Sequence, residues 1–357
     1  MASPVVTRPC RQADAAPGGV RLSVSVRVGA DAAEIAVEPG HLERIFRMTV
    51  CLAIRDGKLS PAEPVVARLV AGKVRERHGA VLCLDSCAVE IARDDGSRVA
   101  RRQFPLATFA AFAAARAVHL LGDGTAAKSE RTEQIGFALH ATSADDDPLP
   151  VARPDLAVVS LTEMAAGAAR QGAPDEVWLA TFVTRAVARS VVEMDERSRT
   201  SGVEAAARIH TRVGFDPTRR CFVRTLERLV VTPVTRATAL SVVSTAASWA
   251  SVLEDGGVVG PRVLSSVHTH LHLARDAGPA DGVAGTHLVA GAGLGAAGDP
   301  CISIEDIVTH YTTFPDPLSA ALIVSLFPDR RVITLYGYTP GARLRVEPGY
   351  WILGGDT

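Results

Sequence analysis

The sequence predicts a mixed α+β fold arranged as two domains. The chain has 357 residues, enough for two domains that each bury a core. Segments in which apolar and polar residues alternate, as in strands, are interspersed with segments of helical periodicity in both halves. Between the halves, the run SADDDPLPVARPD interrupts both periodicities with acidic residues and prolines. We therefore expect a tail at 1–19, a first α+β domain at 20–142, a linker at 143–155 and a second domain at 156–357.

The composition argues against several classes of partner. Lysine and arginine number 38 against 39 acidic residues, so no strong field attracts nucleic acid or an anionic membrane. Aromatic residues are only 5%, too few for a base-stacking surface. We therefore expect neither nucleic acid nor a membrane among the partners, and the oligomeric state is not indicated.

Cysteines and apolar runs indicate the compartment. The six cysteines include no Cys-x-x-Cys pair, so no cysteine zinc knuckle is expected and the thiols are interpreted as buried small hydrophobes. The first residues lack the basic and apolar regions of a signal peptide. The apolar runs stop well short of the roughly 20 residues that span a bilayer. We expect a cytoplasmic protein with reduced thiols.

The first half contains strands and helices but no concentration of catalytic residue types. Residues 21–28, RLSVSVRV, alternate as a half-buried strand does. Residues 41–56 carry apolar side chains at helical spacing. Residues 79–99 predict two strands, the second ending in an Asp-Asp-Gly turn. Residues 104–121 are rich in alanine and predict a helix with a proline near its first turn.

The second half predicts a similar alternation of elements. Helices are expected at 160–173, 245–257 and 303–314. Strands are expected at 176–183, 228–244 (two, joined by a turn), 263–273, 320–328 and 331–338. Residues 184–220 are polar and charged and are interpreted as an insertion, and residues 274–299 form a loop rich in glycine and alanine.

The pair His268 and His270 is the feature that carries chemistry. Residues i and i+2 of a strand point to the same face, so the two imidazoles can reach one metal ion. Zinc prefers imidazole nitrogens and carboxylate oxygens, and a catalytic zinc keeps three protein ligands and one open position. Because surface or core histidines produce the same pattern, its meaning depends on a third ligand.

Asp306 offers that third ligand. It ends the segment Ser303-Ile304-Glu305-Asp306, which opens a predicted helix. Serine followed three residues later by an acid also forms a capping box at a helix start. The two roles are compatible, because a serine that caps a helix can still direct its hydroxyl into a neighbouring cleft.

The His-x-His strand, the Ser-x-x-Asp helix start and the apolar strand after it resemble the JAMM (JAB/MPN) family of zinc metallopeptidases. That family's pattern is a glutamate, then His-x-His-Pro, then Ser-x-x-Asp. The resemblance covers residues 156–350 in the correct order. It implies a curved mixed sheet packed between helices. Leu271 stands where the family has the proline after the second histidine. It implies that Zn²⁺ is bound by His268, His270 and Asp306.

The resemblance also implies two catalytic roles. Glu176 corresponds to the glutamate that takes a proton from water and delivers it to the leaving amine. Ser303 corresponds to the serine that donates a hydrogen bond to the oxyanion. Leu179 stands where the family has a small residue three positions after the glutamate, and 33 positions separate His270 from Ser303. The implied substrate is a peptide or the C-terminal tail of a ubiquitin-like protein.

Other residues and other functions stay open. His272 lies on the same predicted strand face, so it could pair with His270 in place of His268. His310 is interpreted as packed or exposed, and His287 as an outside candidate for a substrate contact. Exposed positions are expected for Glu163, Glu193 and Glu196.

Two alternative functions accompany the first. One is a scaffold or binding module of the same fold without catalytic activity. The other is a different hydrolase that uses a His-x-His motif. That class expects Asp or His soon after the motif, whereas the next aspartate here is Asp276.

Overall fold

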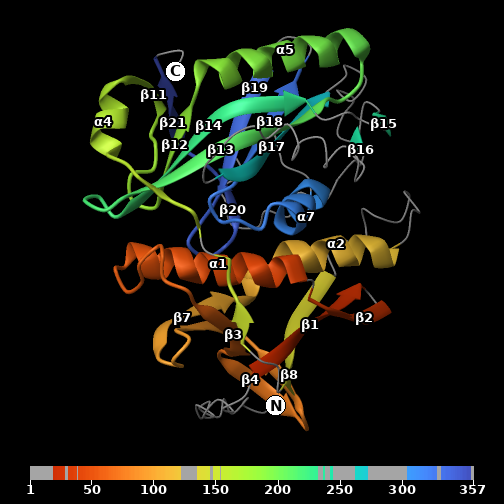
Figure 1. Cartoon of the computed structure of the whole chain (residues 1–357). Helices are drawn as coiled ribbons and strands as arrows, with labels where there is room; N and C mark the ends of the chain where they lie inside the picture. The colour runs from red at the N-terminus through yellow and green to blue at the C-terminus, as the bar shows by residue number, and fades with distance from the viewer. Residues whose placement is uncertain are drawn as a thin grey trace, which may run out of the picture. The chain divides into compact units, whose positions relative to one another are not determined.

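The chain folds into two compact units in a computed structural model (Figure 1). The first unit comprises Met1–Val37 and Val65–Pro150, and the second comprises Glu38–Pro64 and Val151–Thr357. Strands predominate over helices in both units, which confirms the mixed α+β class. The structure describes residues 19–28, 31–37, 39–121, 135–144, 148–152, 154–231, 236–237, 242–243, 262–271, 304–327 and 331–354.

The first unit contains two sheets. One has the strand order β2-β1-β8-β5-β4 and the other has the order β7-β6-β3-β9. The strands are β1 (Gly19–Val28), β2 (Asp31–Ala36), β3 (Val66–Ala71), β4 (Val74–His78), β5 (Val81–Leu84), β6 (Ser86–Ala92), β7 (Arg98–Pro105), β8 (Ile135–Ala144) and β9 (Leu149–Pro150). The helical elements are η1 (Leu106–Phe109) and α2 (Ala110–Leu121).

The apolar alternation of β1 places its core face as predicted. Leu22, Val24 and Val26 are buried, whereas the serines between them are partly exposed. The predicted helix at 104–121 begins later than expected. Phe104 is fully buried and pairs with Cys87 in the β6–β7 ladder, so β7 continues through the proline and α2 starts at Ala110.

The second unit is built on one large sheet of mixed parallel and antiparallel pairs. Its order is β11-β21-β12-β14-β13-β17-β18-β19-β20, with β10 beside β13. The strands are β10 (Ala157–Val158), β11 (Ala168–Gly172), β12 (Leu179–Val183), β13 (Ala206–Asp216), β14 (Cys221–Val231), β17 (Arg262–Leu271), β18 (Ala320–Leu326), β19 (Arg331–Tyr338), β20 (Leu344–Val346) and β21 (Gly349–Leu353). The short strands β15 (Arg236–Ala237) and β16 (Val242–Val243) pair with each other.

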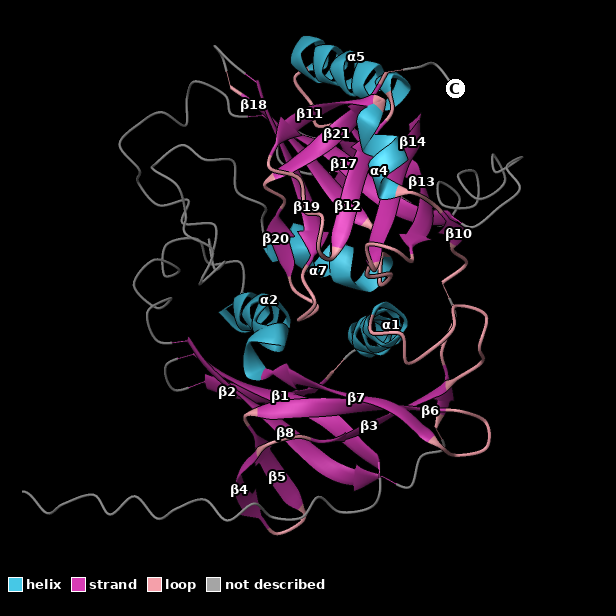
Figure 2. Ribbon diagram, turned by 90° about the vertical axis from the view of Figure 1, so that its left-hand side faces the viewer, coloured by secondary structure: helices cyan, strands magenta, loops and turns pink. Residues whose placement is uncertain are grey.

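Two helices lie on opposite sides of this sheet, α5 (Arg185–Ser201) and α7 (Ile304–Thr313) (Figure 2). The expected insertion at 184–220 is therefore wrong, because it contains α5 and β13. Val187, Val191 and Met194 recur at helical spacing and are buried in a core shared with the sheet. Most of the charged residues of α5 are exposed on its other face, and they hid this apolar stripe in the sequence.

A third helix, α1 (Pro39–Arg55), belongs to the second unit although its sequence lies within the expected first domain. The guanidinium carbon of Arg44 lies 3.9 Å from the centre of the Tyr311 ring on α7. Arg47 forms an ion pair of 3.1 Å with Asp316, just beyond α7. These contacts join segments more than 250 residues apart. The local periodicity of the sequence therefore could not show that α1 packs in the second unit.

The remaining predictions have mixed outcomes. The helix expected at 160–173 is shorter, because α4 (Leu161–Ala166) ends at Gly167 and β11 follows. The boundary between Pro150 and Val151 falls inside the expected linker range. The helix expected at 245–257 and the loop expected at 274–299 lie outside the described residues.

Candidate metal centre

β17 brings His268 and His270 to one face of the sheet. Val267 and Thr269, which alternate with them, are fully buried. The two histidines instead face α7, and their side chains are 17% and 18% exposed. Neighbouring strands on both sides, β13 and β18, fix the backbone of β17. The pair therefore lies on a rigid strand with one side open to solvent.

α7 carries Asp306 to the same point. Its two carboxylate oxygens lie 3.2 Å from Nε2 of His268 and 3.3 Å from Nε2 of His270. The two Nε2 atoms are 2.9 Å apart. The structure thus brings together the three residues that the sequence singled out as ligands.

The spacing of these donor atoms suits a zinc ion. In a tetrahedral zinc site with bonds of about 2.0–2.1 Å, neighbouring nitrogen or oxygen ligands are about 3.3 Å apart. The three separations given above, 2.9, 3.2 and 3.3 Å, are close to that value. A cation shared by the three side chains would accept a lone pair from each of them. The donor set of two imidazoles and one carboxylate is one that zinc prefers.

The histidines control the charge of Asp306. Burial by itself raises the pKa of this carboxyl, but hydrogen bonds and positive charge from both imidazoles lower the pKa well below its usual range. The carboxyl is therefore ionised at neutral pH, the form that ligates metal.

Glu204 is a further candidate residue at this site, and the sequence did not predict it. It lies between α5 and β13, one residue before Ala205, and only 8% of it is exposed. Burial, partly offset by His270 and reinforced by Asp306, raises its pKa from 4.5 to about 7. A carboxyl with this pKa exchanges protons readily at neutral pH, which is what general acid–base chemistry needs.

Hydrogen bonds to Thr269 hold the segment after Glu204 against the histidine strand. The Ala205 amide donates to the Thr269 hydroxyl oxygen at 2.8 Å, and the Thr269 amide donates to the Ala205 carbonyl at 2.9 Å. The same hydroxyl lies 2.7 Å from that of Ser198 on α5. Since Thr269 stands between the two histidines, these bonds couple the position of Glu204 to theirs.

Glu176 is not near this group, and its predicted place beside the histidines is wrong. It is exposed and lies just before β12, which starts at Leu179. Leu179 pairs with Phe222 of β14, and Phe222 pairs with Phe215 of β13. His268 instead pairs with Ala206, nine residues away along β13. At about 3.3 Å per residue this is a separation of about 30 Å.

The other sequence candidates have various outcomes. Ser303, His272 and His287 lie outside the described residues. His310 is packed, which was one of its two predicted positions. Its ring nitrogens lie 3.3 Å from the Ser266 hydroxyl and 3.2 Å from the Ser319 hydroxyl. Burial, with nearby arginines, lowers its pKa to about 3. The predicted exposed positions are confirmed for Glu163, Glu193 and Glu196.

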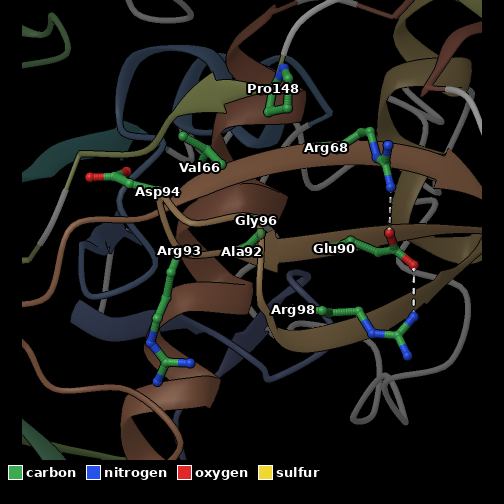
Figure 3. Close-up of a pocket in the computed structure, with 9 residues that line it drawn as sticks. All are labelled: Val66, Arg68, Glu90, Ala92, Arg93, Asp94, Gly96, Arg98 and Pro148. Carbon is green, nitrogen blue, oxygen red and sulfur yellow. Dashed lines mark hydrogen bonds and ion pairs between the residues drawn. The ribbon is translucent and has the colours of Figure 1, made fainter.

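A hollow in the first unit, of about 410 Å³, holds a different kind of site (Figure 3). Glu90 lies in it between Arg68 at 3.0 Å and Arg98 at 3.4 Å, with Arg101 at 3.2 Å. Burial opposes ionisation of Glu90, but these arginines lower its pKa below the usual value. Its oxygens are thus occupied by ion pairs, which makes the hollow a weaker candidate for catalysis than the histidine group.

Comparison with known proteins adds no assignment. No protein-family model matches the chain, and no curated protein matches its sequence. Among the described residues, no helix has both the length and the apolar content needed to cross a bilayer.

Proposed function

We propose that the second unit is a zinc-dependent hydrolase of peptide or isopeptide bonds. The observation that carries the proposal is the convergence of His268, His270 and Asp306 at tetrahedral ligand spacing, beside the buried carboxyl of Glu204. A structural zinc site would be closed by a fourth protein ligand. Here, within the described residues, three candidate ligands lie together and remain partly open to solvent.

Each residue then has a definite role. His268, His270 and Asp306 would hold a zinc ion, which would supply Lewis acidity to acidify water and polarise a carbonyl. Glu204 accepts the proton of the attacking water and passes it to the nitrogen of the departing amine. Because the pKa of Glu204 is near 7, this carboxyl can both accept and donate a proton at neutral pH. Ser303 is the proposed donor to the developing oxyanion.

The resemblance to the JAMM family supports this assignment, and Glu204 fits its pattern better than Glu176 does. A helix, α5, precedes Glu204, and the strand β13 follows it. Ala207 supplies the small residue three positions after the glutamate. The family likeness also suggests the substrate, the extended C-terminal tail of a ubiquitin-like protein or another peptide.

The test compares two glutamate variants. Glu204→Gln keeps the size of the side chain but cannot carry a proton, so hydrolysis of a ubiquitin-like fusion is expected to fall by about 10²-fold or more. Glu176→Gln, at an exposed and distant position, is the matched control and should leave the rate unchanged. Zinc content, measured in both variants, should stay that of the wild type.

Two outcomes would overturn the proposal. Equal rates for Glu204→Gln and the wild type would remove the assigned base. Stoichiometric zinc at this site without hydrolysis of any such substrate would favour the alternative, a scaffold or binding module without catalytic activity.

A further inference from the structure

A second group of potential metal ligands lies in the first unit and is independent of the histidine group on β17. Glu76 and His78 of β4 and Cys83 of β5 each offer one ligand atom, and these atoms lie within 4.8 Å of one another. His140, on the neighbouring strand β8, lies next to Cys83 of this group. Thiolate, imidazole and carboxylate are all zinc ligands.

The strand register explains why these side chains meet. Glu76 pairs directly with Cys83, and Cys83 pairs directly with His140, so the three point to the same face of the sheet. His78 follows Glu76 by two residues and shares that face. The opposite face is the apolar core, formed in these strands by Leu82, Leu84 and Leu139.

Two of the donor separations are those expected between neighbouring ligands of one tetrahedral ion. Sγ of Cys83 lies 3.4 Å from Nδ1 of His140, where a shared zinc would set about 3.5 Å. Oε2 of Glu76 lies 3.3 Å from Nε2 of His78, where a shared zinc would set about 3.3 Å. Cys83 is only 7% exposed, whereas the side chains of Glu76 and His78 are 62% and 69% exposed, so an ion can enter from solvent.

Ser25 completes the arrangement from β1. Its hydroxyl lies 2.7 Å from Nε2 of His140. When Nε2 carries the proton and donates it to Ser25, Nδ1 presents its lone pair toward Cys83. Metal-binding histidines are commonly oriented in this way, through a hydrogen bond from the ring nitrogen that does not bind the metal.

We propose that Glu76, His78, Cys83 and His140 form a zinc site that ties β4, β5 and β8 together. Binding displaces the proton of the Cys83 thiol to solvent, and the thiolate then bonds the metal. The soft thiolate favours zinc over magnesium or calcium, which prefer oxygen ligands alone.

Cobalt(II) substitution of the full chain tests this site separately from the one on β17. A thiolate bound to cobalt gives a charge-transfer absorption in the near ultraviolet, which imidazole and carboxylate ligands lack. The wild type should show this band, and Cys83→Ser should abolish it. His268→Ala should keep it, because the group on β17 contains no thiolate. Cys87→Ala, which removes another buried thiol of the same unit, is the matched control and should also keep it.

Two milder variants guard against loss of folding. His78 is exposed, so His78→Ala should leave the circular dichroism spectrum unchanged while weakening zinc binding at this site by at least about tenfold. Ser25→Ala should weaken it by about 10- to 100-fold. A folded wild type without the cobalt band, or a band that survives Cys83→Ser, would overturn the proposal. So would zinc affinity that is unchanged in His78→Ala.

Discussion

At the scale of single residues, the proton of Glu204 links the candidate site to stability. In the folded chain its pKa is raised from 4.5 to about 7, chiefly by burial. The folded state therefore holds a proton in this pH range that the unfolded state has released. The contribution of Glu204 to the free energy of unfolding is therefore fully present below pH 4.5 and is lost as the pH rises through 7.

This gives a prediction for the metal-free protein. Glu204→Gln removes the titrating group, so the variant should gain stability relative to the wild type as the pH rises from 4.5 to 7. One pKa unit corresponds to about 1.4 kcal/mol, so the relative gain should be on the order of 2–3 kcal/mol. Urea unfolding in the presence of a chelator measures it. Parallel pH profiles for the two proteins would contradict the raised pKa.

At the scale of elements, the turn after α5 delivers Glu204 to the histidine strand. Gly202 ends the helix with φ +67°, a left-handed conformation that side chains disfavour. A methyl group there would meet no atom within 4 Å, so only backbone strain opposes it. Gly202→Ala is therefore expected to lower the free energy of unfolding by about 1 kcal/mol.

Gly167 provides the control for that prediction. It also ends a helix and has open space around it, but its φ is −94°, which alanine adopts freely. Gly167→Ala should leave stability unchanged or raise it slightly. Chemical denaturation of the two variants side by side would contradict the strain at Gly202 if both behaved alike.

Elements also show what the sequence could and could not predict. Two histidines at i and i+2 in an apolar run predicted a strand face, and a Ser-x-x-Asp start predicted the helix that brings Asp306 to them. The role of Glu204 was not predicted, because the charged residues of α5 obscured the buried apolar positions Val187, Val191 and Met194 in the sequence. Without that helix, β13 and the glutamate before it had no recognisable place beside β17.

At the scale of the whole molecule, the chain crosses between its units more often than the sequence suggested. A strand pair of the first unit comes before α1 and the rest of that unit after it, while α1 itself packs in the second. The placement of α1 in the second unit depends on contacts between segments that are distant in the sequence. Apolar periodicity identifies the helix but not the surface that receives it.

The ion pair between Arg47 and Asp316 tests the placement of α1. Both side chains are largely buried, with 24% and 15% exposed. A double-mutant cycle with Arg47→Ala and Asp316→Ala should give a coupling energy of about 1–2 kcal/mol in unfolding experiments. Additive effects of the two substitutions would place α1 away from the loop after α7.

The position of zinc tests the central claim most directly. Anomalous X-ray scattering at the zinc edge, from crystals of the zinc-loaded full chain, locates the ion without reference to activity. We expect a peak about 2.0–2.2 Å from Nε2 of His268, Nε2 of His270 and one oxygen of Asp306, absent in His268→Ala. Crystals of zinc-loaded protein with no anomalous density among these three side chains would contradict the account.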